Sequence, residues 1–279
     1  MKAWDHARWD PVNRINGQFR ANTVSPVPGT PNLAPEPMPG RPDRGRVVEG
    51  ARKVRLGDVS PAGRLRLDAA ARYLQDVSAD DTAEAALPEA EAWVVRRTVM
   101  EVRAFPRYLE PLALATWCSG TGSHYAERRV EVVGGAGGRI DAVSLWVHLD
   151  HATGRPRRLS EAFAARYGEA AGGRRIKGRL LHPGPPGTAM GRPWPWPLRF
   201  TDFDVLSHVN NAAYWEVVEE VLATRRDLRA PVRAELEHRV AIERGAAVDV
   251  QVDEGADRVS LWIAADGVLA ATAVVRALG

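Results

Sequence analysis

The 279-residue sequence has one cysteine, no long apolar run and no apolar segment at its start. The single Cys118 excludes an internal disulfide framework, and without a Cys/His cluster the sequence gives no sign of a structural zinc site. A membrane-spanning helix needs about 18–20 consecutive apolar residues, and no stretch reaches that length. The first residues lack the apolar core of a signal peptide. We therefore expect a cytoplasmic protein with no membrane span, no metal and no cofactor.

Lysine is also scarce, with only Lys2, Lys53 and Lys177 among 38 basic residues. Residues 1–48 contain seven Lys/Arg and four Asp/Glu, whereas residues 49–279 contain 31 of each. The net charge of +3 therefore belongs to the N-terminal segment, and the neutral remainder does not predict nucleic-acid binding. One local exception is the segment 155–179, which has eight basic and two acidic side chains.

Proline marks the domain boundaries. Eight of the 20 prolines fall in residues 1–48 and six in residues 182–197. Such stretches bury too little apolar surface to order themselves. We predict a disordered Pro-rich arm over 1–48, a first domain over 49–181, a linker over 182–193 and a second domain over 194–279. Trp194 and Trp196 are expected to fix the end of the linker to the surface of one domain.

The two predicted domains read as copies of each other. Residues 54–77 align without a gap on residues 198–221, at an offset of 144. The alignment pairs Asp58 with Asp202, Gly63 with Ser207, Gln75 with Glu219 and Asp76 with Glu220. At an offset of 136, residues 99–115 align on 235–251. Order and spacing, more than identity, therefore predict an internal duplication.

Each copy reads as a short strand, a loop, one long helix and several strands. The second helix, expected over about 211–226, is apolar around most of its circumference, as for a helix that a curved sheet encloses. The later segments are short, alternating and rich in valine, with Gly, Pro and Asp between them. We therefore predict an α+β fold, a tandem (double) hot-dog in which two antiparallel sheets each wrap one long helix.

The segment DFDVLSHVNNAAYWEVVEE, residues 202–220, resembles the D-x-D-x-x-x-H-V-N-N-x-x-Y-x-x-x-x-E signature of hot-dog thioesterases. Similarity to the acyl-ACP thioesterase family extends over about residues 50–275. It includes Y-L-Q-D (73–76), W-x-x-R-R-T (93–98), L-W-V (145–147) and L-E-H-R (236–239). The resemblance implies a thioester hydrolase that releases free fatty acid from acyl carrier protein.

The residue types of this segment suit thioester hydrolysis. Asp204 is placed to act as base or nucleophile, and His208 to orient water or protonate the leaving thiolate. Asn210 is a good N-cap, and the backbone N–H groups after it can hold the oxyanion of a tetrahedral intermediate. Asn211 and Tyr214 are expected at the substrate, although each has a structural interpretation, as a loop hydrogen bond or a core residue.

A helix carboxylate is expected to assist. Glu220 matches the plant-type enzymes and Glu219 the spacing in single-domain hot-dog thioesterases, so we assign catalysis to Glu220 and leave Glu219 as a substrate-binding alternative. The first copy lacks the reacting groups, since Ser60 and Arg64 replace Asp204 and His208. We expect one active site per chain, with Gln75 and Asp76 of the first copy reaching the shared interface.

Two departures from the plant enzymes keep other functions open. Leu206 stands where those enzymes have Asn, and Ala241 and Ile242 stand where they have the Glu and Cys implicated in catalysis. An acyl-CoA thioesterase and a non-catalytic protein that binds acyl chains or acyl carrier protein are therefore the alternatives. His238 can face the pocket, but a structural role is favoured.

The basic segment 155–179 is either an ordinary solvated surface or a docking site for the acidic acyl carrier protein. In the second case Arg157, Arg158, Arg174, Arg175 and Lys177 are the candidates. Nucleic acid is not expected as a partner. The duplication already provides a hot-dog pair within one chain, so both a monomer and a homodimer are allowed.

Overall fold

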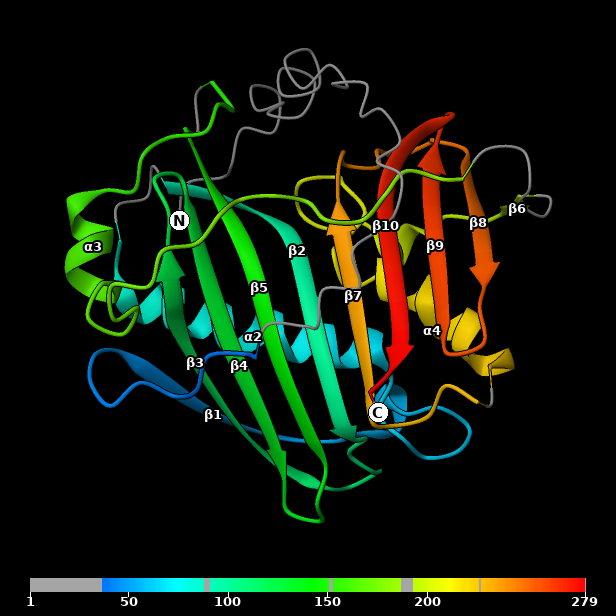
Figure 1. The fold of residues 1–279 in the computed structure, drawn as a ribbon, viewed down its shortest axis with the longest axis horizontal. Helices are drawn as coiled ribbons and strands as arrows, with labels where there is room; N and C mark the ends of the chain where they lie inside the picture. Colours follow the sequence, from blue (N-terminus) through cyan, green and yellow to red (C-terminus); the bar gives the residue numbers. More distant parts are fainter. Residues whose placement is uncertain (1–36, 88–90, 151–152, 187–192, 226, 279) are drawn as a thin grey trace.

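The computed structural model describes residues 37–87, 91–150, 153–186, 193–225 and 227–278. These residues form one ten-stranded antiparallel sheet, and the two longer helices lie together on one of its faces (Figure 1). The predicted α+β tandem hot-dog fold is confirmed.

The first copy supplies two helices and five strands. They are β1 (Val47–Lys53), the 3-10 turn η1 (Leu56–Asp58), α2 (Leu67–Ala85), β2 (Glu91–Ala104), β3 (Pro111–Thr121), β4 (Tyr125–Gly134), β5 (Arg139–Asp150) and α3 (Glu161–Tyr167). The second copy supplies β6 (Trp194–Pro195), the 3-10 turn η2 (Phe200–Asp202), α4 (Tyr214–Thr224), β7 (Val232–His238), β8 (Val248–Glu254), β9 (Arg258–Ala265) and β10 (Val268–Ala277).

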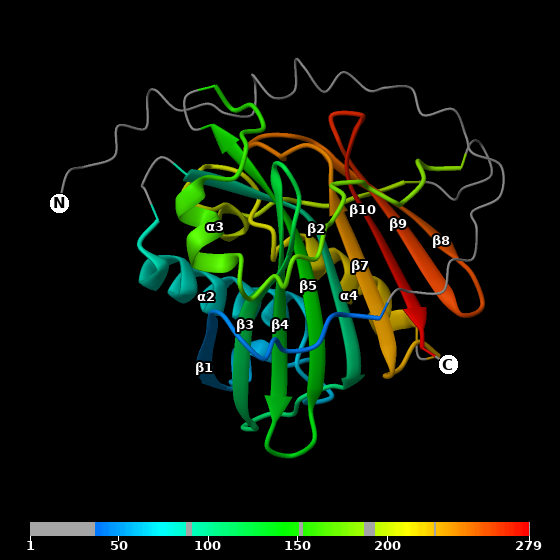
Figure 2. The same ribbon diagram turned by 60° about the vertical axis from the view of Figure 1, so that its left-hand side comes forward.

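The two expected sheets are joined edge to edge. The strand order is β1-β3-β4-β5-β2-β7-β10-β9-β8-β6, so β2 and β7 form the junction. Their register runs from the pair Arg97–Glu237 to the pair Val102–Val232. The edge strand of each copy is therefore covered by the other copy, which leaves no open edge between them. Figure 2 shows the continuous twisted sheet from the side.

Alternation along β7 separates the core from the outer face. Val232, Ala234 and Leu236 are buried on the face that carries the helices. Arg233 and Glu237 point to the other face, because side chains of successive strand residues point to opposite sides. On that outer face Arg233 bonds Glu101 of β2 at 2.6 Å, so the junction is apolar inside and ionic outside.

The helices form for different reasons. The alanine-rich α2 has strong intrinsic helix propensity and ends where Ala86 turns left-handed, at φ 50°. The valine-rich α4 has weak propensity but is stabilised by burial, with Trp215, Val217 and Val218 almost fully enclosed. It begins at Tyr214, later than the expected 211, because residues 211–213 form a separate turn.

The duplication is confirmed at the level of single hydrogen bonds. The backbone N–H of Ser60 donates to the carbonyl of Arg64 and that of Asp204 to the carbonyl of His208, at the same offset of 144. The turns η1 and η2 are also 144 residues apart. The two loops therefore share one backbone conformation and differ in their side chains.

The segment after the first copy crosses the outer face of the second. The Glu237 carboxylate accepts the backbone N–H groups of Leu181 (2.5 Å) and His182 (3.0 Å), and Trp262 donates to the carbonyl of Pro183. Residues 187–192 of the predicted linker lie outside the described residues. After them, Trp194 pairs with Val250 of β8, as expected for a fixed linker end.

The predicted arm, residues 1–48, lies outside the described residues up to residue 36. Its last part contacts the first copy: β1 begins at Val47, and Arg46 bonds the buried Asp81 at 2.6 Å. Among the described residues, no helix is both long and apolar enough to cross a membrane.

Candidate active site

Asp204, the first predicted site residue of the loop 204–210, stabilises the turn of this loop through its side chain. One carboxylate oxygen of Asp204, Oδ1, accepts the backbone N–H groups of Leu206 (2.8 Å) and His208 (3.3 Å). Ser207 between them has a φ of 61°, a left-handed conformation that costs a non-glycine residue about 1 kcal/mol. No described residue donates to the second oxygen, Oδ2. Asp204 is half-buried, so this oxygen is available for chemistry.

Asn210 holds the turn that leads into α4. Its Oδ1 accepts the backbone N–H of Ala212 at 2.8 Å and the side-chain Nε2 of Gln75 at 3.1 Å. The residue at the N-cap of α4 is Ala213, so Asn210 caps the preceding turn and not the helix. Neither the backbone N–H nor the side chain of Asn211 has a hydrogen-bond partner among the described residues. The expected loop hydrogen bond of the Asn211 side chain is therefore absent there.

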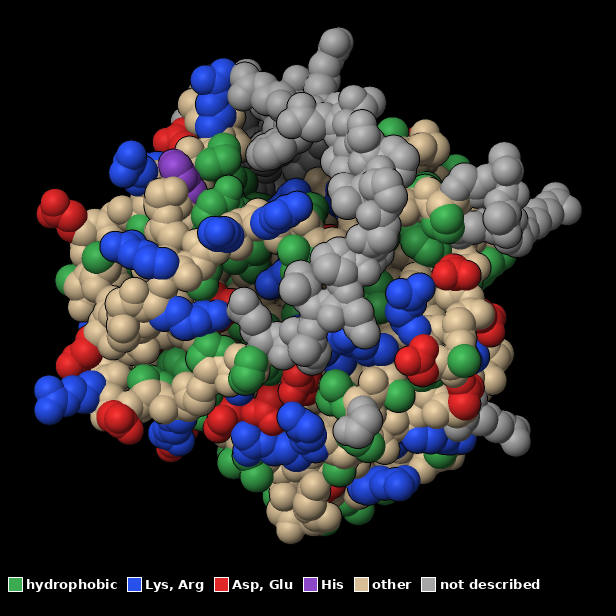
Figure 3. All heavy atoms as spheres, in the orientation of Figure 1, with side chains coloured by type: hydrophobic (Ala, Val, Ile, Leu, Met, Phe, Trp, Pro, Cys, Tyr) green, Lys and Arg blue, Asp and Glu red, His purple; other side chains and the backbone are tan. Residues whose placement is uncertain are grey.

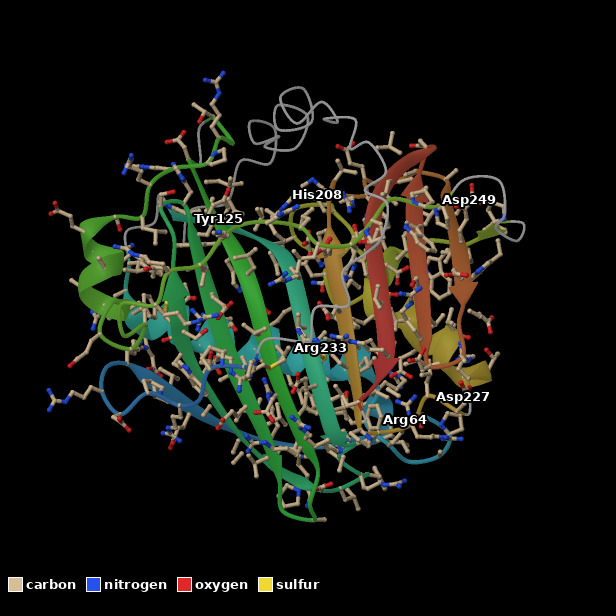
Figure 4. The ribbon with its side chains drawn as sticks, viewed as in Figure 1. Arg64, Tyr125, His208, Asp227, Arg233 and Asp249 are labelled. Atoms are coloured by element: carbon tan, nitrogen blue, oxygen red, sulfur yellow. The ribbon has the colours of Figure 1, made fainter. Side chains whose placement is uncertain are left out.

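The corresponding turn of the first copy holds a carboxylate. Leu67, the counterpart of Asn211 at the offset of 144, donates its backbone N–H to Glu219 Oε1 at 2.6 Å. Arg64, the counterpart of His208, binds both oxygens of Glu219 at 2.9 and 2.7 Å. This N–H position therefore accommodates a carboxylate-sized anion. Figure 4 shows Arg64 and His208 toward opposite ends of the strands beside the junction of the two copies.

Neither of the two candidate glutamates of α4, Glu219 and Glu220, joins the loop 204–210. Glu219 is buried and bound to the loop of the first copy. Glu220, the predicted catalytic carboxylate, is exposed and takes part in none of the hydrogen bonds of the loop. The reason is the packing of α2 against α4, which sets each loop opposite the helix of the other copy. Of the two predicted residues of the first copy, Gln75 reaches this loop through its hydrogen bond to Asn210, whereas Asp76 pairs with Arg52.

Tyr214 belongs to the core. Its side chain is buried, its ring packs edge-on against His238 at 4.8 Å between centroids, and burial raises the pKa of its hydroxyl. His238 lies on the inner face of β7, and burial, with Arg96 nearby, lowers its pKa to about 3. Its Nε2 atom has no hydrogen-bond partner among the described residues. Both residues therefore belong to the buried core that packs against the loop and are not exposed beside it.

A cavity of about 780 Å³ lies between the two copies beside this loop. The second copy contributes Asn210, Ala212 and Ala213, which form the turn before α4. The first copy contributes the end of β1 and one face of α2, including Gln75 and Asp76. Its volume is in the range of small-molecule sites. The turn before α4 and helix α2 of the other copy therefore face one common space, whereas Asp204, His208 and Asn211 are not among the residues that line it.

The five basic docking candidates are not equivalent. Arg174 pairs with the buried Glu127 and donates to the carbonyl of Ser119, so it is a structural residue. Arg157 lies 3.8 Å from Asp150. Arg158, Arg175 and Lys177 are exposed. Figure 3 shows that Lys and Arg side chains on the sheet face are spread among Asp and Glu and do not gather in one patch.

Two groups at the interface were not predicted as site residues. In the sequence Arg64 only replaces His208 in the first copy, but in the structure it binds Glu219 across the interface. The hydroxyl of Tyr73 donates to Asp58 at 2.6 Å at the edge of the cavity. The offset of 144 contains the signal for Arg64, because it pairs this residue with the candidate site residue His208. Sequence alone has no equivalent signal for Tyr73.

Family models and known proteins match most of this chain. A family model described as the acyl-ACP thioesterase N-terminal domain matches residues 45–167, and one described as the C-terminal domain matches residues 193–269. Two curated relatives from Mycobacterium tuberculosis, uncharacterized proteins Rv2001 and MT2057, are each 34% identical over 239 residues. These matches cover 85% of this chain and 95% of each relative.

Solved structures show the same fold over most of the chain. A putative oleoyl thioesterase from Lactobacillus plantarum has a TM-score of 0.69 at 19% identity, covering 83% of this chain and 95% of that one. An acyl-ACP thioesterase from Bacteroides thetaiotaomicron has a TM-score of 0.69 at 16% identity, covering 82% and 97%. The 12:0-ACP thioesterase from Umbellularia californica has a TM-score of 0.67 at 18% identity, covering 84% and 97%. With both family models in chain order over most of its length, the chain belongs to the acyl-ACP thioesterase family.

Proposed function

We propose that this chain hydrolyses fatty acyl thioesters of acyl carrier protein, at one site formed by the loop 204–210. The observation that supports this most strongly is the turn before α4. Its Asn211 N–H has no hydrogen-bond partner among the described residues, and the offset of 144 makes it the counterpart of the Leu67 N–H that binds the Glu219 carboxylate. A tetrahedral oxyanion has a similar charge and size, and such donors stabilise it strongly.

In the proposed reaction Asp204 Oδ2 draws a proton from water as the water oxygen attacks the thioester carbonyl. The carbonyl oxygen becomes negative and is held by the backbone N–H of Asn211. When the intermediate collapses, the carbon–sulfur bond breaks and His208 supplies the proton that the thiolate takes up. The proton held by Asp204 then passes to His208 through solvent, which restores both groups. The products are a free fatty acid and the thiol. Direct attack by Asp204 on the carbonyl, followed by hydrolysis of the anhydride, uses the same atoms.

The first copy contributes to the site without reacting. Gln75 donates to Asn210 Oδ1, which already accepts the N–H of Ala212, so Gln75 supports the turn from across the interface. Asp76 lines the cavity and pairs with Arg52 at 2.5 Å. Glu220 has no step in this reaction. For docking of the carrier, the exposed Arg158, Arg175 and Lys177 stay candidates on charge alone.

The experiment is thiol release from acyl-ACP and matched acyl-CoA substrates, for the wild type, Asp204→Asn and Ser60→Ala. Asp204→Asn keeps the size of the side chain but cannot accept the proton, so we expect kcat to fall about 10³-fold. Ser60 occupies the same backbone position in the first copy, so Ser60→Ala is the matched control and should keep the wild-type rate.

Circular dichroism and thermal unfolding establish that both variants fold. Full activity of folded Asp204→Asn would exclude the assigned base. Binding of acyl-ACP without thiol release by the wild type would identify a non-catalytic acyl-binding protein, in which Leu206, Ala241 and Ile242 replace reacting groups of the plant enzymes. Faster turnover of acyl-CoA than of acyl-ACP would favour the acyl-CoA thioesterase alternative.

A further inference from the structure

The cavity beside Asn210 has a charged mouth that the proposed reaction does not use. Four basic residues of the first copy line it: Arg52, Lys53, Arg55 and Arg72. Three acidic residues also line it: Asp58, Asp76 and Glu216. The sign of the net charge at the mouth therefore depends on which of these side chains are already paired with an opposite charge.

The acidic residues at the mouth are all engaged. Asp58 accepts the backbone N–H of Arg55 and the hydroxyl of Tyr73. Asp76 accepts from the guanidinium of Arg52. Glu216 pairs with the guanidinium of Arg199. Asp58 also lies 3.7 Å from the guanidinium of Arg72, so each of the three acidic residues has a cationic partner other than Lys53 and Arg55.

Two of the four basic side chains at the mouth have no acidic partner among the described residues. Arg52 is paired with Asp76, and Arg72 binds the buried Asp68 at 2.8 Å. Lys53 and Arg55 are exposed, and neither has an acidic partner within 4.0 Å among the described residues. Lys53 ends β1, and Arg55 immediately precedes η1. Two unpaired cations therefore stand two residues apart at the mouth of the cavity whose wall contains Asn210.

We propose that Lys53 and Arg55 bind the phosphate at the end of the pantetheine arm that presents the thioester. The inference rests on the proposed thioesterase function. The pantetheine chain is neutral apart from this phosphate. The cavity is lined by the neutral amides of Gln75 and Asn210 and has two cations at its mouth, so a neutral chain can lie inside while its phosphate stays beside the cations. Guanidinium and ammonium groups are the usual phosphate ligands of proteins. Acyl carrier protein and coenzyme A share this phosphate.

The basic segment 155–179 cannot serve the same phosphate. Lys53 pairs with Pro111 at the start of β3, whereas Arg175 bridges to Thr121 at its end. Ten residues of strand separate these positions, about 33 Å at about 3.3 Å per residue. One phosphate cannot contact both surfaces, so substitutions in the two places test different docking sites.

The test compares the wild type with Lys53→Glu/Arg55→Glu, using acyl-4′-phosphopantetheine and acyl-pantetheine, which differ only in the phosphate. We expect kcat/KM for the phosphorylated substrate to fall about 10-fold or more, mainly through KM. The value for acyl-pantetheine should stay within about twofold. Acyl-ACP and acyl-CoA should lose activity together, and the loss should shrink with added salt. Arg175→Glu/Lys177→Glu is the matched control and should lose nothing on acyl-4′-phosphopantetheine.

Binding of free 4′-phosphopantetheine, followed by calorimetry, gives a readout independent of hydrolysis. Its Kd should rise about 10-fold in Lys53→Glu/Arg55→Glu and stay unchanged in the control pair. Equal losses on both pantetheine substrates, or a phosphate-specific loss in the Arg175/Lys177 pair instead, would overturn the proposal. A wild type that binds 4′-phosphopantetheine through these residues but releases no thiol would contradict the thioesterase function alone.

Discussion

The loops 60–66 and 204–210 have the same backbone hydrogen bonds, but the groups beside them differ. In the first, Arg64 and the N–H of Leu67 enclose the carboxylate of Glu219. In the second, Asn210, with Ala212 and Ala213 of the turn that follows it, lines a cavity. One backbone design thus serves as an ionic clamp at one end of the interface and as a candidate reaction site at the other. Within the loops the difference arises from side chains, and beyond them α2 begins at once whereas α4 begins after the turn 211–213. The two ends can therefore serve as controls for each other.

Removing Glu219 should have the largest effect on stability. Glu219→Ala leaves Arg64 and the Leu67 N–H without their partner in a mostly buried place, and we expect a loss of about 3 kcal/mol in the free energy of unfolding. Glu220→Ala, at the exposed neighbouring position, should change it by less than about 0.5 kcal/mol. Urea unfolding measures both. Loss of thiol release by Glu219→Ala with unchanged stability would assign Glu219 to the reacting site instead.

A second difference between the copies predicts a pH effect. His238 corresponds, at the offset of 136, to Val102 of the first copy. Burial, with Arg96 nearby, lowers the pKa of His238 to about 3, so the folded chain keeps it neutral while the unfolded chain protonates below about pH 6.5. Because the unfolded chain binds this proton more readily, the free energy of unfolding decreases as the pH falls from about 6.5 towards 3.

For the wild type this amounts to about 2 kcal/mol between pH 7 and pH 5. His238→Val should lack that part of the pH dependence, which unfolding curves at the two pH values measure as a difference between the proteins. An unchanged slope in the variant would mean that His238 gains a proton in the folded state.

The smallest expected effect is catalytic and concerns Gln75, the counterpart of Glu219. Gln75→Ala removes the donor to Asn210 Oδ1, so we expect kcat to fall about 10-fold with little change in unfolding free energy. Gln75→Glu has the same size but cannot donate when ionised, and it should lose as much. A rate restored by Gln75→Glu would show that size, and not the hydrogen bond, supports the turn.

The sequence predicts the backbone better than the pairing across the interface. Strict spacing of 144 residues is enough to place both loops, since the same turns need the same local hydrogen bonds. It also places the candidates Asp204, His208 and Asn210 in one loop, whatever the rest of the fold does. The single continuous sheet depends on β2 meeting β7, a contact between distant segments with no local pattern.

The helix carboxylate shows where such reasoning fails. Helix α4 is apolar around most of its surface, so its periodicity does not say which of Glu219 and Glu220 turns inward. The antiparallel arrangement of the copies then sends the inward one to the opposite loop, which only the packing of α2 against α4 determines. The role of Lys53 is likewise invisible in sequence, since its significance depends on which acids nearby are already paired.

The β2–β7 junction lies within one polypeptide, and this changes what a substitution can do. In a two-fold homodimer every substitution appears at both ends of the interface, so a residue useful at one end must be tolerated at the other. Here Arg64 and His208 occupy equivalent places on a single chain and are encoded separately. Each end is therefore free to change alone, and a titration with a tight inhibitor should count one occupied site for each chain.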